Sequence, residues 1–439
     1  MTKDKKGYSL WKKSIKVIPG GNGLLSKRPE RYAGKYWPTY FEKAVGINLF
    51  DLSGNKWKDF AQMGLGCAIL GYNNTEVNQY VSKFISKGIN TTLNCPEEYI
   101  LAKKLVKLNS FAKYVKYSRT GGEAMAIAVR IARAKTLTTS LAFSGYHGWH
   151  DWYIASNLQN RNNLDEQLLP GLKTNGVPKE LIETAFPFKY NSLSSLKKVL
   201  KLNSNIKIII IEGARKSLLK KEIVEYLNYL KKNKNFVIIV DEITSGLRTS
   251  CSGAFKKTKL NPNIAVYGKA LGNGFAINAI VGDEIMDCAQ DTFISSSFHT
   301  ERVGFVAAIK TLEILERDKV WISLDSMGKL LLKGINKIAK KYDIKIQTND
   351  FFPLPSYDFN YKDQNSAYHT FFIQEFLKKG YLTSGSIYLS SKHTKKEIEK
   401  YLFHFDRITF KLKKILEKNE DIKKYLKIPI IDTGFKRLT

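Results

Sequence analysis

Long hydrophobic runs and paired cysteines are both missing from this sequence. No segment approaches the roughly 20 consecutive apolar residues of a membrane-spanning helix. The opening residues, MTKDKKGYSLWKKSIKV, lack the apolar core of a signal peptide. The four cysteines, Cys67, Cys95, Cys251 and Cys288, are widely separated and form no CxxC pair. This argues against a disulfide framework or a zinc cluster, and we expect a cytoplasmic protein without a membrane partner.

Acidic residues are scarce relative to basic ones. The chain has 40 Asp and Glu against 71 Lys and Arg, which gives a formal net charge of +31. Such an excess raises the question of nucleic acid as a partner, but the lysines are scattered, and the densest stretch, LKKNKN at residues 230–235, is short. We interpret the charge as a solvated basic surface, with attraction of phosphorylated or nucleotide-linked substrates as the alternative, and expect no nucleic-acid partner.

The sequence also has no low-complexity block and no internal repeat. Its 439 residues, 43% of them hydrophobic, suffice for one large domain and a smaller one. In the middle of the chain, short apolar runs alternate with helix-period stretches, which is the βαβ pattern of a parallel sheet. The predicted strands cover residues 114–117, 140–143, 207–211, 236–240 and 263–267, and the clearest helices cover residues 123–135 and 194–202.

The two ends of the chain differ from the middle. Residues 40–59, with glycine turns at Gly46 and Gly54, predict a hairpin or three strands. From about residue 312 the pattern is mostly helical around the stretch FFPLPSYDFN. We therefore predict an α/β protein in which residues 66–312 form a large domain. Residues 1–65 and 313–439 would form a smaller α+β domain together.

Two carboxylates, Asp241 and Glu242, directly follow the predicted strand FVIIV. Ligands of open α/β sheets bind at the carboxyl ends of the strands, and a carboxylate buried there is costly without a partner. The residues alone leave three roles open for Asp241. It can be a metal ligand, a ribose-binding acid or the counter-ion of a protonated heteroaromatic ring.

One lysine follows another predicted strand. Lys269 lies in GKALGNG, directly after NIAVY, and it precedes the glycines, so the segment is not a Walker P-loop. Its small neighbours leave room for a ligand. A desolvated lysine amine forms Schiff bases with aldehydes, whereas the alternative interpretation is an ordinary surface lysine.

Two glycine turns follow predicted strands at the same edge of the sheet. In SRTGGEA, residues 118–124, backbone N–H groups at a helix start can bind phosphate, and the same residues also form a plausible helix cap with Thr120 and Glu123. In FSGYHGWHD, residues 143–151, an aromatic ring can lie against a flat cofactor. No third ligand follows His147 and His150 at a useful spacing, so we predict no metal site.

These motifs occur in the order TGGEA, GYHG, DEITSGLR and GKALGNG. In this order the sequence resembles the class III pyridoxal-phosphate aminotransferases, and among them the glutamate-1-semialdehyde aminomutase group. The likeness extends from about Pro19 to near the end of the chain. It implies fold type I with a mainly parallel, seven-stranded type of sheet, a homodimer with shared active sites, and pyridoxal 5′-phosphate as cofactor.

The resemblance also implies roles for individual residues. Lys269 would hold the cofactor as a Schiff base, and Asp241 would pair with its pyridine nitrogen. The remaining cofactor-binding residues would be Thr120, Gly121 and Gly122 at the phosphate, Tyr146 and Ile243 on the two ring faces, His147, Glu212, and Ser297 donated by the neighbouring subunit.

The implied reaction moves an amino group from an amino-acid donor such as glutamate to a small or sugar-like carbonyl acceptor, through pyridoxamine phosphate. The alternatives are the glutamate-1-semialdehyde 2,1-aminomutase of tetrapyrrole synthesis and a non-catalytic protein that keeps the fold. Arg119 stands where the aminomutase type has a small amide, and Gly213 replaces a proline, which argues against assuming aminomutase activity. The extra tryptophans, Trp149 and Trp152, indicate either an altered substrate wall or core aromatics.

Overall fold

A computed structural model describes residues 4–167, 170–361 and 364–431 of the chain. Its contacts divide the chain into two compact units, one made of residues 1–74 and 322–439 and the other of residues 75–321. The sequence-based boundaries were 65 and 312, whereas the contacts place them at 74 and 321. Within the described part of the chain, no helix combines the length and the apolarity needed to cross a membrane.

The unit of residues 75–321 is built on a seven-stranded sheet in the order β4-β10-β9-β8-β7-β5-β6. All neighbouring pairs are parallel except those of β10, which runs antiparallel to β4 and β9. The strands are β4 (Tyr114–Ser118), β5 (Leu141–Ser144), β6 (Ala185–Pro187), β7 (Ile208–Glu212), β8 (Val237–Glu242), β9 (Ile264–Tyr267) and β10 (Asn278–Gly282).

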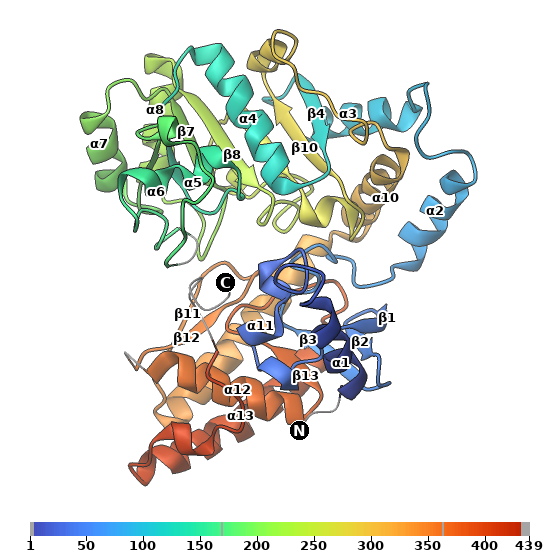
Figure 1. Cartoon of the computed structure of the whole chain (residues 1–439), viewed down its shortest axis with the longest axis vertical. Helices are drawn as coiled ribbons and strands as arrows, with labels where there is room; N and C mark the ends of the chain where they lie inside the picture. The colour runs from blue at the N-terminus through green and yellow to red at the C-terminus, as the bar shows by residue number, and fades with distance from the viewer. Residues whose placement is uncertain (1–3, 168–169, 362–363, 432–439) are drawn as a thin grey trace. The chain divides into compact units, whose positions relative to one another are not determined.

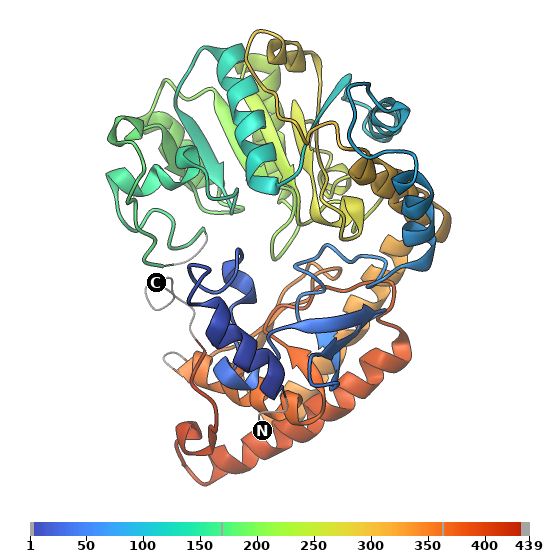
Figure 2. The ribbon, with the colours of Figure 1, turned by 45° about the vertical axis from the view of Figure 1, so that its right-hand side comes forward.

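Helices cover this sheet, and α4 crosses one of its faces in both ribbon views (Figure 1, Figure 2). Small and branched residues of α4, such as Ala128 and Ile131, are fully buried and pack with β8 residues such as Ile239. Burial of an isoleucine side chain such as Ile131 contributes about 1.5–3 kcal/mol. The helices of this unit are α2 (Thr75–Ile85), α3 (Pro96–Leu108), α4 (Gly121–Thr136), α5 (Asp151–Ile154), α6 (Ser156–Gln159), α7 (Leu193–Leu202), α8 (Lys221–Lys234), α9 (Phe255–Thr258) and α10 (Arg302–Asp318).

The other unit contains a four-stranded sheet in the order β1-β2-β3-β13, which joins segments from both chain ends. Figure 2 shows the blue strands of the early chain beside orange β13, which pairs in parallel with β3. A second, two-stranded sheet pairs β11 with β12. The elements are α1 (Lys5–Ser14), β1 (Phe41–Val45), β2 (Asn48–Asp51), β3 (Lys56–Phe60), most of α11 (Val320–Tyr342), β11 (Ile346–Thr348), β12 (Tyr357–Phe359), α12 (Asn365–Lys378), β13 (Tyr381–Thr383) and α13 (Lys395–Glu417).

Candidate active site

Asp241 lies at the end of β8 and is only 5% exposed. One carboxylate oxygen, Oδ1, accepts a hydrogen bond from the backbone N–H of Ile243 at 2.9 Å. The other oxygen, Oδ2, lies 2.8 Å from Nδ1 of His147. Two partners therefore hold this buried carboxylate, which offsets much of the cost of removing it from water.

His147, the partner of Asp241, is 1% exposed. Its second ring nitrogen, Nε2, is 3.2 Å from the carbonyl oxygen of Ser144. A carbonyl oxygen only accepts hydrogen bonds, so Nε2 must carry a proton. The other ring nitrogen, Nδ1, contacts Asp241, so His147 links the Ser144 carbonyl to the Asp241 carboxylate.

Lys269 follows β9 and begins the 3₁₀ turn η5 (Lys269–Gly272). Its φ of 42° lies in the left-handed region, which costs energy for a residue with a side chain. Its Nζ donates a hydrogen bond of 2.8 Å to Oγ1 of Thr244, which belongs to the turn after β8. The amine and the Asp241 carboxylate thus occupy neighbouring positions at the carboxyl edge of the sheet, because β8 and β9 are adjacent and parallel.

The turn before α4 combines a helix cap with an open backbone. Thr120 Oγ1 accepts from the N–H of Glu123, and the Glu123 carboxylate accepts from the N–H of Thr120, which completes a capping box. The N–H groups of Gly121 and Gly122 belong to the first helical turn, which has no acceptors inside the helix. The helix-cap and anion-binding interpretations are therefore compatible.

Both glycines of this turn have close neighbours. A Cβ on Gly121 would lie 3.2 Å from Cδ1 of Ile243, and a Cβ on Gly122 would lie 3.1 Å from Cδ2 of His150. Ile243 therefore lies beside this turn. It also lies beside Gly268, which precedes Lys269, since a Cβ on Gly268 would be 3.3 Å from Ile243. These contacts bring the SRTGGEA, DEIT and GKALGNG segments together.

The aromatic turn after β5 is held by two residues that lie outside its motif. Gln167 Oε1 accepts from the Gly145 N–H at 2.8 Å, and the Tyr153 hydroxyl donates to the Gly145 carbonyl at 3.0 Å. The next residue, Tyr146, keeps 43% of its surface exposed. The backbone beside Tyr146 is therefore held in place, while the residue itself stays exposed.

The two extra tryptophans have different environments. Trp152 is 6% exposed and belongs to the hydrophobic core. Trp149 is 71% exposed and stacks on His150, with ring centroids 4.6 Å apart. Because His150 contacts the turn at Gly122, only Trp149 is available as a wall beside it.

Glu212 ends β7 beside Asp241, with which it is paired in the sheet register. Burial raises the pKa of its carboxyl group, while Arg215, whose Nε is 3.5 Å from Oε2, opposes that shift. Among the described residues Oε2 has no hydrogen-bond partner. A Cβ on Gly145 would lie 2.4 Å from that oxygen, so the carboxylate lies against the aromatic turn.

Comparison with known proteins identifies the chain's family. The sequence model of the class-III aminotransferases matches residues 32–380. A 3-aminobutyryl-CoA aminotransferase of Cloacimonas acidaminovorans is 31% identical, over 84% of this chain and 88% of that protein. This chain therefore belongs to the class-III aminotransferases.

Two further relatives agree with this assignment. A glutamate-1-semialdehyde 2,1-aminomutase of Nitrosopumilus maritimus is 29% identical to this chain. The similarity covers 90% of this chain and 96% of the aminomutase. The fold matches that of the FumI protein of Sphingopyxis sp. MTA144, solved in its PLP internal aldimine form, with a TM-score of 0.84, 20% identity and full coverage of both chains. The predicted family, fold type and enzyme class are thereby confirmed, and the cofactor of the aminotransferase is pyridoxal 5′-phosphate.

The aminotransferase's residues fit this cofactor. A glycine turn at a helix start suits a phosphate, and a paired carboxylate suits a protonated ring nitrogen. Among the described residues Oε2 of Glu212 has no hydrogen-bond partner, only the 3.5 Å ion pair with Arg215, so it can accept a hydrogen bond from a ligand. No group of three or more His, Cys, Asp or Glu among the described residues is arranged to bind a metal ion.

Ser297 lies in the exposed segment before α10 of the aminotransferase. Its carbonyl oxygen accepts a hydrogen bond of 3.2 Å from Nδ2 of Asn90. This hydrogen bond links Ser297 to the segment before α3. Its predicted contact with a neighbouring subunit's phosphate stays a prediction.

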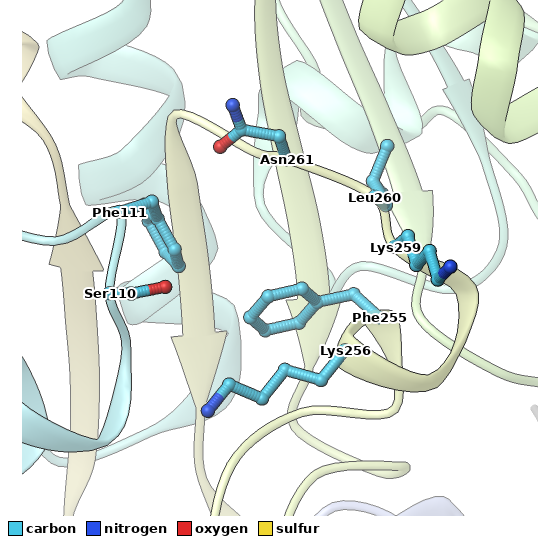
Figure 3. Close-up of a pocket in the computed structure, with 7 residues that line it drawn as sticks. All are labelled: Ser110, Phe111, Phe255, Lys256, Lys259, Leu260 and Asn261. Carbon is cyan, nitrogen blue, oxygen red and sulfur yellow. The ribbon is translucent and has the colours of Figure 1, made fainter.

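A pocket of about 430 Å³ lies elsewhere on the same unit, lined by Ser110, Phe111, Phe255, Lys256, Lys259, Leu260 and Asn261 (Figure 3). Phe111 precedes β4 and Asn261 precedes β9, so the pocket is at the amino edge of these strands. The clustered functional groups of the aminotransferase are at the carboxyl edge, and this pocket is separate from them.

Several residues of the site escaped the sequence-based prediction. Thr244 and Gln167 have no motif of their own, and Gln167 acts 22 residues away from Gly145 in the sequence. The sequence suggests only a metal-binding role for His150, whereas in the structure it lies beside Gly122 in the turn before α4 (the phosphate turn, Thr120–Gly122). The spacing of GYHGWH indicates the position of His150 only when the turn after β5 is known to contact the turn before α4.

Proposed function

We propose that this aminotransferase moves an amino group from glutamate to a small carbonyl acceptor, and that a nucleotide-linked acceptor is favoured. The observation that carries the proposal is the cluster of Lys269, Asp241 and the turn Thr120–Gly122 at one sheet edge. The excess of basic residues and the 31% identical relative named a 3-aminobutyryl-CoA aminotransferase support an anionic, nucleotide-linked substrate.

When bound, pyridoxal phosphate supplies an electron-withdrawing ring that makes the substrate Cα proton removable. Lys269 Nζ is the base that takes this proton, and Thr244 Oγ1, 2.8 Å away, holds the amine in position. Asp241 would pair with the ring nitrogen and favour its protonated form. His147 orients the Asp241 carboxylate through the 2.8 Å contact between Nδ1 and Oδ2.

The other residues bind and orient the cofactor. Thr120, Gly121 and Gly122 hold the phosphate with the N–H groups at the start of α4. Tyr146 and Ile243 would pack against opposite faces of the ring. The Glu212 carboxylate, whose Oε2 pairs with Arg215 and has no hydrogen-bond partner among the described residues, would be the polar neighbour of the ring substituents.

We also propose that the enzyme is a cytoplasmic homodimer in which Ser297 reaches the phosphate of the other subunit. Large apolar side chains are exposed on two adjoining segments: Ile89 at 39%, Leu93 at 81%, Phe293 at 85% and Phe298 at 63%. Hydrogen bonds from Asn90 to Ser297 and from Arg302 to Ile89 join these segments. Contiguous exposed apolar surface is typical of a protein interface, and four free cysteines suit a reducing compartment.

The substrate test is a pair of half-reactions. Glutamate should convert the bound cofactor to its amine form with release of 2-oxoglutarate, and acceptors should then restore the original absorption. We expect 3-oxobutyryl-CoA to restore it at least about tenfold faster than free 3-oxobutyrate or a keto sugar at equal concentration. Equal rates would contradict recognition of a nucleotide-linked group. Inertness toward every amino acid tested would contradict the transaminase.

The second candidate function is the aminomutase, which is favoured by the 29% identity to such an enzyme over 90% of the chain. An aminomutase needs no second amino donor or acceptor. The enzyme loaded with the amine form of the cofactor should then convert glutamate 1-semialdehyde to 5-aminolevulinate over many turnovers without added amino acid. A single turnover at most is the result expected of the transaminase.

A further inference from the structure

Arg119 directly precedes the phosphate turn, and its guanidinium group contacts backbone from two other parts of the chain. It donates to the carbonyl oxygens of His299 at 3.1 Å and Glu301 at 2.6 Å, and also to that of Phe298. It also donates to the carbonyl oxygen of Ala276 at 3.2 Å. A guanidinium has five N–H donors in a fixed plane, and most of them are used here.

The surroundings hold this side chain in one place. The Glu301 carboxylate is 3.6 Å from the Arg119 guanidinium, which also lies over the Phe305 ring at 5.0 Å from its centroid. A Cβ on Gly304 would lie 2.2 Å from Nη1, so α10 approaches through a glycine. Burial lowers the pKa of Arg119, and Glu301 opposes that shift.

The carbonyl partners belong to functionally distinct segments. Ala276 follows η5, the turn that begins with Lys269. Phe298 to Glu301 lead from Ser297 into α10, which Glu301 caps through the N–H groups of Val303 and Gly304. A second tie joins the same segments, since His299 Nε2 is 2.9 Å from the capping-box carboxylate of Glu123.

We propose that Arg119 is a positioning residue that sets the phosphate turn relative to the Lys269 loop. A cofactor held by its phosphate at one end and by Lys269 at the other requires a fixed separation of the two ends. Arg119 is one peptide bond from Thr120 and bonded to the loop through Ala276, so it fixes that separation. The inference rests on the proposed placement of the phosphate at Thr120–Gly122.

The test compares Arg119→Gln and Arg119→Lys with the control Arg133→Gln in full-length apo-enzyme. Arg133 lies near the other end of α4, donates 2.9 Å to the Thr139 carbonyl, and likewise has a pKa lowered by burial. Calorimetric titration measures the affinity for pyridoxamine phosphate and for pyridoxamine, which has no phosphate. Thermal melting of each apo-protein reports the general structural cost.

Arg119→Gln is expected to bind pyridoxamine phosphate about tenfold or more weakly, because it loses several charge-assisted hydrogen bonds. Pyridoxamine affinity should change by less than about twofold, Arg119→Lys should recover part of the loss, and Arg133→Gln should bind both ligands like the wild type. If Arg119→Gln does not fold, the decision rests on Arg119→Lys, with an intermediate loss expected for the phosphorylated ligand alone.

Two results would overturn the inference. One is wild-type affinity for pyridoxamine phosphate in a folded Arg119 variant, and the other is an equal loss for both ligands. The wild-type enzyme separates this failure from that of the proposed function. If wild type itself binds pyridoxamine phosphate no better than pyridoxamine, the phosphate placement is wrong.

Discussion

At the residue scale, the account depends most on Asp241, whose carboxylate is held by Ile243 and His147. In the proposed site Asp241 pairs with the ring nitrogen, so we expect Asp241→Asn to lower the rate of amino transfer by about a hundredfold or more. The matched control is Asp283→Asn, another partly buried aspartate that is bonded to Asn263 at 2.8 Å. The control should retain a rate within about twofold. Similar losses in both variants would contradict the assignment.

The neighbouring carboxyl group, Glu242, predicts a dependence of stability on pH. Burial raises its pKa from 4.5 to about 7, even though Ser245 and the Phe255 N–H donate to it. A raised pKa in the folded state means that the stabilising contribution is complete below pH 4.5 and is lost as the pH rises through about 7. The upper limit of this change is about 3 kcal/mol.

Glu242→Gln should remove that dependence. The difference in unfolding free energy between variant and wild type, measured by urea titration at several pH values, should therefore favour the variant increasingly from pH 4.5 to 7. A difference that stays constant across this range would show that Glu242 does not titrate there.

The positions of single site residues were predictable from the sequence where each residue belonged to a longer motif. Lys269 and Asp241 do lie at the ends of neighbouring strands, because each follows an apolar run that could only be buried. The orienting role of His147 was not predictable, since it depends on the Ser144 carbonyl that accepts its second hydrogen bond. The network around Arg119 was hidden for the same reason, because its partners are backbone carbonyls up to 182 positions away.

At the element scale, the contact between the aromatic turn and the phosphate turn carries a prediction. Gly148 has a φ of +104°, and a Cβ there would lie 2.7 Å from Cα of Gly122. Gly148→Ala should lower the unfolding free energy by about 2–4 kcal/mol and weaken pyridoxal phosphate binding. The control is Gly176→Ala, where φ is +84° and nothing lies within 4 Å, and it should cost only about 1–2 kcal/mol.

These effects are measured by thermal melting and cofactor titration. Equal effects of the two substitutions would mean that only backbone strain matters at Gly148. A larger effect at Gly148, accompanied by weaker cofactor binding, would support the close approach of the two turns.

The five predicted strands all exist, within about two residues at each end, because continuous apolar runs mark strands that are buried on both faces. Two strands of the sheet, β6 and β10, are not predicted by the sequence pattern. The first has only three residues, Ala185–Pro187, and the second follows the lysine loop without a helix, which breaks the βαβ alternation. The sequence pattern also assigned LEILERD to the small domain, whereas these residues end α10 in the unit of residues 75–321.

At the scale of the whole molecule, the proposed dimer predicts a difference between two highly exposed leucines, Leu93 and Leu137. Leu93→Asp places a charge in the exposed apolar surface near Ser297, and we expect it to shift the enzyme toward monomers and to weaken cofactor binding. Leu137→Asp is the control, because Leu137 is 90% exposed at the end of α4, and it should leave the dimer intact. Sedimentation velocity decides, and a monomeric wild type or a dimeric Leu93→Asp would contradict the proposed interface.

The two-unit organisation was foreseeable from the change of pattern along the chain, whereas its boundaries were not. α10 and α11 follow one another almost without a loop, from Arg302 to Tyr342, so the sequence has no break at the point where the contacts change unit. The substrate was not predictable from the sequence either. Composition gives the net charge of the protein, but it does not give the positions of the side chains that would bind a charged group.

The central claim is that Lys269 binds pyridoxal phosphate covalently, and the absorption spectrum tests it most directly. Apo-enzyme titrated with pyridoxal phosphate should develop a visible absorption band, and borohydride reduction should then fix the cofactor's mass on the peptide that carries Lys269. In Lys269→Ala both signals should be lost, while the phosphate turn still binds pyridoxamine phosphate. A band that persists in Lys269→Ala, or a cofactor found on another lysine, would contradict the account.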